Sequence, residues 1–349
     1  MALKFKCRNC DKEIIAKWLK IGELVRCRSC GEMVAVPANA TPTEEESTLL
    51  GVKIPEVGLA DSQVQAKPAI KGKTKDPNYP SISHAISLMI AVVVFTIVFT
   101  FVAGGIWMAL GYRIAQHRWL GASTSFAAIL FVVCYGLSKT GLRFNEVFYF
   151  RSFSMSTILP LVLMLLGSAI LLSEVDNAVR FVLPAPRLVA GFLVDAIKTS
   201  FWSSFMWAVI LAPLGEELLF RGLVLRGFLA RYSVTKAIIV SSLLFAILHL
   251  NPWQLPSAFA LGVLFAWFFV KTRSLWPCLL GHAITNALAV VAIQLQLGIP
   301  GFTPEYLGKA HFQPLWFDLM GLLLFGCGLW VLIRAFKREG EHAVVQAEQ

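Results

Sequence analysis

The chain has 349 residues, of which 57% are hydrophobic and only 15% are charged, and its mean hydropathy is +0.68. Soluble domains average about 45–50% apolar and about 25% charged residues, so a single soluble core is excluded and several bilayer-spanning helices are expected. The formal net charge of +10 says little about nucleic acid, because basic residues in membrane proteins concentrate in cytoplasmic loops.

Two Cys-x2-Cys pairs open the chain, Cys7 with Cys10 and Cys27 with Cys30. This paired spacing is typical of a four-cysteine structural zinc site, and so small a unit needs a metal for its stability. Two disulfides in an oxidising compartment are the alternative, but no secretory signal sequence precedes the unit. We therefore predict a zinc ribbon in the cytoplasm, with a structural Zn²⁺ held by the four cysteines.

The composition divides the chain into four parts. Residues 37–82 are rich in Pro, Thr, Ser, Lys and Glu, which predicts a flexible linker that does not fold alone. From residue 83, apolar runs of roughly 20 residues predict an all-α polytopic membrane domain. The predicted parts are a zinc ribbon at 1–36, the linker at 37–82, a transmembrane domain at 83–338 with its motif core at 200–295, and a tail at 339–349.

The apolar runs predict about eight transmembrane helices. They lie near 85–110, 120–138, 156–174, 200–220, 236–250, 255–271, 275–295 and 314–335. We expect the fourth to continue past Arg221 as a partly interfacial helix. A short amphipathic helix at 187–200 is expected to lead into it.

Basic residues are biased towards the loops on one side of these helices. With the amino terminus inside, the cytoplasmic loops and tail contain Lys139, Arg143, Arg151, Arg226, Arg231, Lys236, Lys271, Arg273, Arg334, Lys337 and Arg338, and the opposite loops contain Arg113, Arg118, Arg180, Arg187, Lys198 and Lys309. The positive-inside rule therefore predicts a cytoplasmic amino terminus, in agreement with a reduced zinc ribbon. No internal repeat is visible, which argues against an inverted-repeat transporter.

The stretch "GEELLFRG", residues 215–222, places three ionisable side chains in an apolar helical segment. Glu217 and Arg221 are four residues apart and can form an ion pair on one helical face. Glu216 is rotated by about 100° from Glu217, so we expect its carboxylate to escape this pairing and to act as a base. The alternative is a solvated salt bridge where the helix leaves the membrane.

Two further stretches, "FAILH" and "HAITN", carry polar side chains on other predicted spans. His249 lies near a helix end, because Pro252 stops the helix, and His282 and Asn286 share one helical face. Taken singly, a helix-end histidine and a polar contact between helices explain these residues. Polar groups on three spans must nevertheless lie close together in the fold, since each would otherwise face lipid.

Together the three stretches resemble the motifs of the CAAX-protease and bacteriocin-processing family of intramembrane proteases (CPBP, also called Abi). The motifs of that family run Glu-Glu-x-x-x-Arg, Phe-x-x-x-His and His-x-x-x-Asn, on successive helices and in this order. This sequence matches every motif position, with Glu216, Glu217, Arg221, Phe245, His249, His282 and Asn286. The resemblance covers residues 200–295, and the ribbon and linker lie outside it.

The resemblance implies an intramembrane endopeptidase with a water-accessible cavity in the membrane. By analogy, Glu216 and His249 activate the attacking water, His282 and Asn286 stabilise the oxyanion, and the arginine of the first motif holds the second glutamate. Peptide hydrolysis needs such a base and such donors. A catalytic Zn²⁺ on these Glu and His side chains is an open alternative, but the His-Glu-x-x-His pattern is absent, and we favour metal-independent hydrolysis.

The expected partners follow from this reading. They are a membrane-associated protein or peptide as substrate, the lipid bilayer, and a protein that docks on the ribbon; nucleic acid is not expected. The alternative function is a non-catalytic membrane protein that binds a peptide or lipid, of the bacteriocin-immunity or scaffold type. A transporter or channel ranks last, because the polar residues cluster in the carboxy-terminal half.

Overall fold

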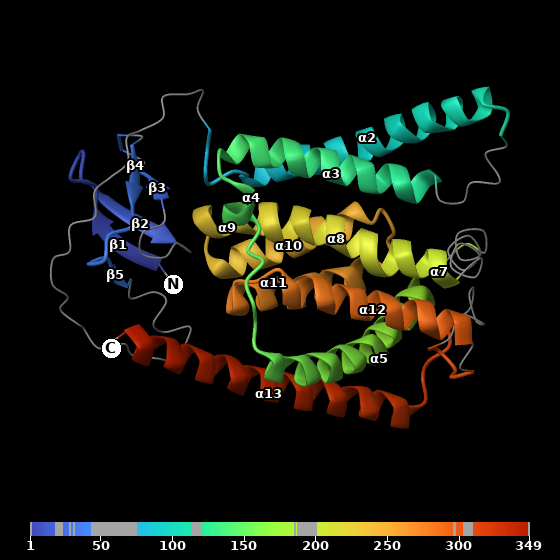
Figure 1. Ribbon diagram of the computed structural model, residues 1–349. Helices are drawn as coiled ribbons and strands as arrows, with labels where there is room; N and C mark the ends of the chain where they lie inside the picture. Colours follow the sequence, from blue (N-terminus) through green and yellow to red (C-terminus); the bar gives the residue numbers. More distant parts are fainter. Residues whose placement is uncertain are drawn as a thin grey trace.

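The computed structural model describes residues 2–17, 24–27, 29–30, 32–42, 75–112, 120–184, 186, 201–295, 298–302 and 310–347. Figure 1 shows a small β domain near the amino terminus and a bundle of long helices. The predicted amphipathic helix at 187–200 and most of the predicted linker lie outside the described residues, as do Arg113, Arg118, Arg187, Lys198 and Lys309.

The β domain contains two small antiparallel sheets. The strands are β1 (Ala2–Lys6), β2 (Glu13–Lys17) and β5 (Thr41–Pro42) in one sheet, in the order β2-β1-β5, and β3 (Leu24–Arg26) with β4 (Met33–Ala35) in the other. Along β1, Leu3 and Phe5 are buried while Lys4 and Lys6 are exposed, as expected for a strand with one covered face. Residues of β2, β3 and β4 complete this small apolar core.

Six helices of the described chain are long and apolar enough to cross a membrane. They are α2 (Ile82–Ala109), α3 (Leu120–Thr140), α5 (Ile158–Val182, preceded by a 3-10 turn at Met155–Thr157), α11 (Leu255–Thr272), α12 (Trp276–Leu295) and α13 (Leu315–Ala347). A shorter apolar helix, α10 (Val234–Leu248), and a four-residue helix, α4 (Phe144–Val147), are also present. The chain is therefore an integral, multi-pass membrane protein, with six rather than eight uninterrupted long spans in its described part.

The predicted fourth span is a helical segment in which two π-helical stretches interrupt the α-helix. It consists of α7 (Phe201–Ser204), the π-helical η3 (Phe205–Leu211), α8 (Ala212–Glu217), the π-helical η4 (Leu218–Leu225) and α9 (Arg226–Arg231). It continues past Arg221, as predicted, but it is not interfacial there, because every residue of η4 is buried in the bundle. π-helical turns within α-helices occur frequently at functional sites.

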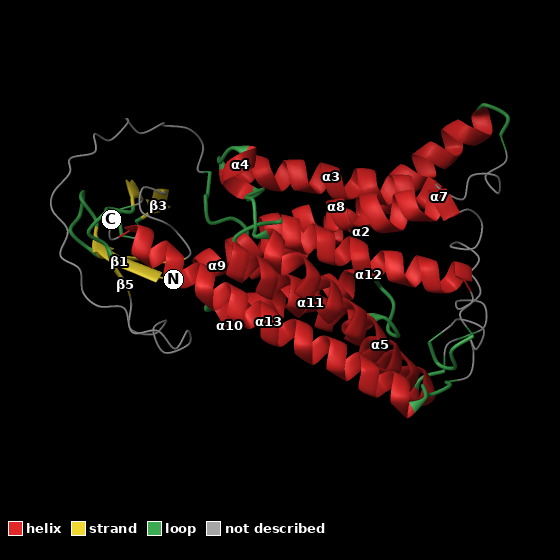
Figure 2. Cartoon of the chain, turned by 60° about the horizontal axis from the view of Figure 1, so that its bottom comes forward, coloured by secondary structure: helices red, strands yellow, loops and turns green. Residues whose placement is uncertain are grey.

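The other helices surround this segment. η4 contacts α3, α9, α10 and α11, α12 contacts α8 and η3, and α13 packs along α5. Figures 1 and 2 show most of these helices running side by side along one common direction. The packing is tight at Gly222, where a Cβ atom would lie 2.3 Å from Cδ1 of Phe148. The buried segment therefore lies at the centre of the helical core.

Candidate active site

The seven motif residues come from four helical elements that meet in this core. They are Glu216 and Glu217 at the end of α8, Arg221 in η4, Phe245 within α10, His249 at the carboxy-terminal cap of α10, and His282 and Asn286 in α12. The structure gathers Glu216, Glu217, Arg221 and His282 into one polar cluster. His249 and Asn286 are each bonded to a backbone carbonyl instead.

Glu217 is the centre of the cluster. Arg221 Nη1 donates to Glu217 Oε1 at 2.9 Å, and His282 Nδ1 lies 2.8 Å from the same oxygen. Glu217 is 0% exposed and Arg221 is 2% exposed, so this ion pair is not a solvated bridge at the membrane surface. Burying charged groups is costly unless they are paired and hydrogen-bonded, and these contacts supply that pairing.

The guanidinium of Arg221 is held from a second direction by α11. Its Nη2 donates to the carbonyl oxygen of Gly262 at 3.1 Å. The rings of Phe245 and Phe265 lie 4.6 Å and 5.3 Å from its Cζ atom, measured to the ring centroids. An aromatic face attracts a cation at such distances. The arginine is therefore fixed by a carboxylate, a carbonyl and two aromatic rings.

Glu216 has a different environment from its neighbour. Its side chain is 19% exposed, and its Oε2 atom lies 3.9 Å from His282 Nε2, which is too far for a direct hydrogen bond. Within the described residues this buried oxygen has no hydrogen-bond partner. Glu216 therefore does not share the hydrogen bonds of Glu217, and its role as a base stays a prediction.

The imidazole of His282 lies between the two glutamates. Glu217 Oε1 accepts from Arg221, and a carboxylate oxygen of such a pair only accepts, so Nδ1 is the donating nitrogen of His282 in this contact. The other ring nitrogen, Nε2, is directed towards Glu216. His282 is 5% exposed. One nitrogen of the ring is thus held in place while the other remains available.

His249 lies at the end of α10, as Pro252 predicted. Its Nδ1 donates to the carbonyl oxygen of Phe245 at 3.0 Å, and this leaves Nε2 as an acceptor. Its ring packs edge-on against Phe245 at 5.0 Å between centroids, and Phe245 packs edge-on against His282 at 5.8 Å. Within the described chain, His249 and Glu216 form no direct hydrogen bond, and Phe245 lies between the rings of His249 and His282.

Asn286 compensates for a proline in the neighbouring helix. In a π-helix each carbonyl accepts from the N–H five residues later, and the residue five positions after Ala208 is Pro213, which has no N–H. Nδ2 of Asn286 donates to the carbonyl oxygen of Ala208 at 2.7 Å. A carboxamide has two N–H donors, so one of them remains after this contact.

Sequence reasoning missed two residues that complete the cluster, Gly262 and Phe265 of α11. Both lie in an apolar run without any polar residue to mark it. A Cβ atom at Gly262 would lie 2.9 Å from Cβ of Ser242 on α10, so glycine allows the close approach that presents its carbonyl to Arg221. The sequence offers one signal for this contact, a glycine within a predicted span. Its role as a point of close approach becomes visible only once the packing of α10 against α11 is known.

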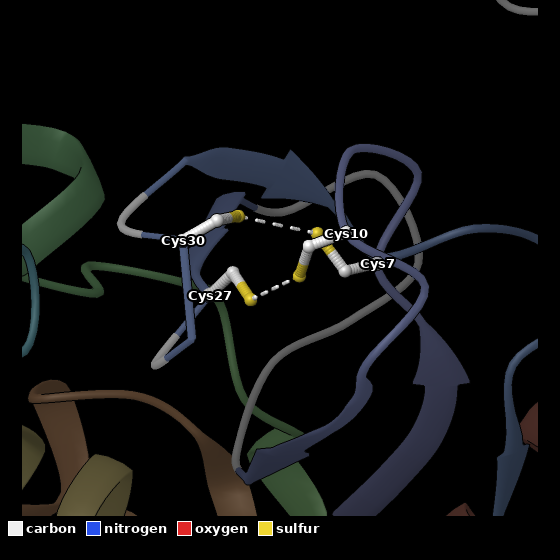
Figure 3. A group of neighbouring side chains, drawn as sticks. All are labelled: Cys7, Cys10, Cys27 and Cys30. Atoms are coloured by element: carbon white, nitrogen blue, oxygen red, sulfur yellow. Dashed lines mark hydrogen bonds between the residues drawn. The ribbon is translucent and has the colours of Figure 1, made fainter.

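The four cysteines of the β domain form a separate cluster, with their sulfur atoms facing one another (Figure 3). All four Sγ atoms lie within 4.8 Å of one another. Cys7 Sγ is 3.7 Å from Cys30 Sγ, and Cys10 Sγ is 3.6 Å from Cys27 Sγ. Four thiolates around a tetrahedral metal with bonds of about 2.3 Å have sulfurs ~3.8 Å apart. The cluster therefore fits a structural metal ion and not two disulfides.

The thiols of this cluster differ in acidity. Backbone N–H groups of Cys30 and Ser29 donate to Cys27 and lower the pKa of its thiol to about 6. For Cys10, the backbone contact with Lys12 lowers the pKa, but burial and the neighbouring sulfurs outweigh it and raise the pKa to about 12. Several thiolates so close together repel one another, and a bound cation removes this repulsion.

In the described residues, these cysteines are the only group of three or more His, Cys, Asp or Glu residues that brings ligand atoms close enough for a metal. The intramembrane cluster does not form a comparable ligand set. There, Glu217 Oε1 is already occupied by Arg221 and His282.

Comparison with known proteins agrees with the position of the motifs. Residues 198–288 match the family described as type II CAAX prenyl endopeptidase Rce1-like, and all three motifs lie inside this range. An 82-residue stretch is 27% identical to the Bacillus subtilis (strain 168) protein named "Putative membrane peptidase YdiL", and it covers 24% of this chain and 34% of that protein. The resemblance predicted from the motifs is thereby confirmed.

The chain thus aligns with about a third of the length of this relative. No solved structure matches the chain significantly. The ribbon and linker lie outside the matched residues.

Proposed function

We propose that the chain hydrolyses a peptide bond of a membrane-associated protein or peptide. The match of residues 198–288 to the Rce1-like family model supports an intramembrane CAAX-type protease in general. The water is activated by Glu216 together with His249. The donors for the oxyanion are His282 and Asn286. Arg221 and Glu217 act by holding His282.

The observation that carries this proposal is the unequal pairing of the two glutamates. Glu217 accepts from Arg221 and His282, while Glu216 Oε2 is buried beside His282 without a hydrogen-bond partner among the described residues. A stable fold tolerates an unpaired carboxylate in an apolar core only at a cost, so such a group is a candidate for function. A carboxylate in this setting is suited to act as a base.

Glu216 takes a proton from the water as the water oxygen attacks the carbonyl carbon of the scissile bond. The oxyanion accepts hydrogen bonds from the second N–H of Asn286 and from Nε2–H of His282. The C–N bond breaks, and the proton on Glu216 passes to the leaving amine nitrogen.

The role of His282 requires a particular protonation state. Its Nδ1–H is directed to Glu217, so a second proton on Nε2 makes the ring an imidazolium. Nδ1 of the ring lies 2.8 Å from Glu217 Oε1, and Nε2 lies 3.9 Å from Glu216 Oε2. Nε2 therefore faces the side of the cluster on which the proposed base lies.

We further propose that the metal requirement is confined to the ribbon. The cysteine spacing and the sulfur distances fit Zn²⁺, which there serves the stability of a small domain. The intramembrane cluster lacks a comparable set of ligand atoms within the described residues. The basic loops predict that the ribbon lies on the cytoplasmic side.

Cleavage by the purified full-length chain in proteoliposomes tests this function. The probes are a farnesylated peptide ending in a CAAX sequence and unprenylated single-span peptides, with products identified by mass spectrometry. We expect cleavage of at least one probe, and loss of cleavage in Glu216→Ala and in His249→Ala at an unchanged Tm. Full activity of both variants would refute the residue assignment. Binding of probes without any cleavage would favour the scaffold function instead.

A further inference from the structure

α11 carries none of the motif residues, yet it contributes a side chain to the polar cluster. Phe265 is 0% exposed and belongs to the largest fully buried side chains of the described protein. Its ring contacts Arg221 and His282, which both have roles in the proposed function. Gly262, one turn earlier on α11, presents its carbonyl to the same arginine.

The first contact is with His282. The two rings are stacked, with centroids 5.4 Å apart and an angle of 26° between their planes. Phe245 meets the same imidazole edge-on, at 5.8 Å and 82°. One ring stacked on the imidazole and another edge-on to it thus restrict the plane of the imidazole, while the hydrogen bond to Glu217 restricts its rotation.

The second contact is with Arg221, whose Cζ lies 5.3 Å from the centroid of Phe265. The backbone of α12 also approaches the ring closely. At Gly281, the residue before His282, a Cβ atom would lie 3.1 Å from Cε1 of Phe265. The ring of Phe265 therefore contacts Arg221 and the imidazole of His282 together, and it lies against the backbone of α12.

We propose that Phe265 is a positioning residue of the hydrolytic site, which holds the imidazole of His282 in the plane that directs Nδ1 to Glu217 and Nε2 to Glu216. This role rests on the proposed function for its catalytic meaning, but the geometry it predicts is measurable without catalysis. Leucine at this position keeps apolar volume and removes the flat face, so the imidazole gains freedom to tilt. A small misplacement of a reacting group lowers the rate by one to two powers of ten.

A matched control exists on the same helix. Phe268 is also 0% exposed, and its ring packs against Phe265 and Trp267, at 6.3 Å and 5.5 Å between centroids. Phe268→Leu therefore removes the same amount of buried aromatic surface from α11. Phe265→Met provides a second variant, because an unbranched thioether fills core space without a ring.

The decisive measurement is the ring N–H resonance of His282 in histidine-labelled protein, assigned by its loss in His282→Gln. We expect the hydrogen-bonded Nδ1–H signal to disappear or shift in Phe265→Leu and Phe265→Met, and to persist in Phe268→Leu. An unchanged signal in both Phe265 variants, or equal loss in the control, would refute the positioning role. This readout needs no substrate, so it separates failure of this inference from failure of the proposed function.

Kinetics give the second readout, with the membrane peptide that the wild-type chain cleaves. We expect kcat of Phe265→Leu to fall by about tenfold or more with KM within about twofold, and Phe268→Leu to retain its kcat within about threefold. A fall of equal size in both variants would show a general packing effect and would contradict the proposal.

Discussion

At the scale of single residues, the buried ion pair of Glu217 and Arg221 shows which contacts a sequence can predict. Spacing along one helix predicted the pair, because residues four apart lie on one face. It did not predict that His282, which is 65 residues away, shares the same carboxylate oxygen. Periodicity orients side chains within one helix, whereas contacts between helices depend on packing.

Arg221→Ala leaves the carboxylate of Glu217 buried without its cation. We expect a loss of about 3–5 kcal/mol in the free energy of unfolding, since removing one partner of a buried ion pair exposes an uncompensated charge to a medium of low polarity. The measurement is reversible unfolding in mixed micelles.

The matched control for this variant is Arg180→Ala. Arg180 and Asp176 also lie four residues apart and form an ion pair, but their side chains are 20% and 30% exposed. This pair is expected to contribute less than ~1 kcal/mol. Equal losses for the two variants would contradict the importance of burial at Glu217.

At the scale of elements, the helix from Phe201 to Arg231 shows what a hydropathy pattern cannot predict. The apolar run predicted a regular span, and a continuous helical segment is present, but η3 and η4 are π-helical. The proline at 213 removes a donor, and Asn286 on another helix replaces it. Because this compensation comes from a side chain distant in sequence, the bonding pattern is a tertiary property.

A double-mutant cycle can measure the coupling between Asn286 and Pro213. Asn286→Ala leaves the carbonyl of Ala208 without this donor, and we expect a loss of about 1–3 kcal/mol in stability. Pro213→Ala restores a backbone N–H, so the same asparagine substitution should cost less in that background. Thermal unfolding of the four proteins measures the coupling, and strictly additive effects would refute it.

α10 and α11 show the same limit in another form. The end of α10 was predictable, because Pro252 marks it, and His249 lies at that end. The contribution of Gly262 and Phe265 on α11 was not, because these residues lie among apolar neighbours that every span requires. Motif residues identify a site in a sequence, whereas the apolar side chains that orient them become visible only in the fold.

At the scale of the whole molecule, composition was sufficient to predict a multi-pass membrane protein. Eight spans were predicted, and six long ones are present in the described chain. The other two predictions correspond to α10, which has only 15 residues, and to the helix that is divided by π-turns. Neither is enclosed by neighbouring helices along its whole length, because Ile239, Leu243 and Ile247 of α10 and Trp202 and Met206 of the divided helix are exposed.

The ribbon and the membrane domain have separate cores, so loss of metal should affect only one of them. We expect a chelator, or Cys7→Ser combined with Cys30→Ser, to unfold the ribbon, because metal binding is coupled to the folding of such small domains. Limited proteolysis detects this unfolding. The exposed Cys134 of α3 provides a control, and Cys134→Ser should leave the ribbon protected.

The same treatment should leave the Tm of the membrane domain and the cleavage of a membrane peptide unchanged. Cleavage that disappears with the chelator and returns with added Zn²⁺ would contradict this expectation. It would also favour a metal at the intramembrane glutamates and histidines.

The central claim is that an unpaired carboxylate within the membrane domain activates water for peptide hydrolysis. The most direct measurement compares the cleavage rate of the wild-type chain with that of Glu216→Gln, which keeps the shape of the side chain and removes its basic oxygen. The account predicts a fall of about 100-fold or more with no loss of Tm. A Glu216→Gln protein that cleaves at the wild-type rate would contradict it.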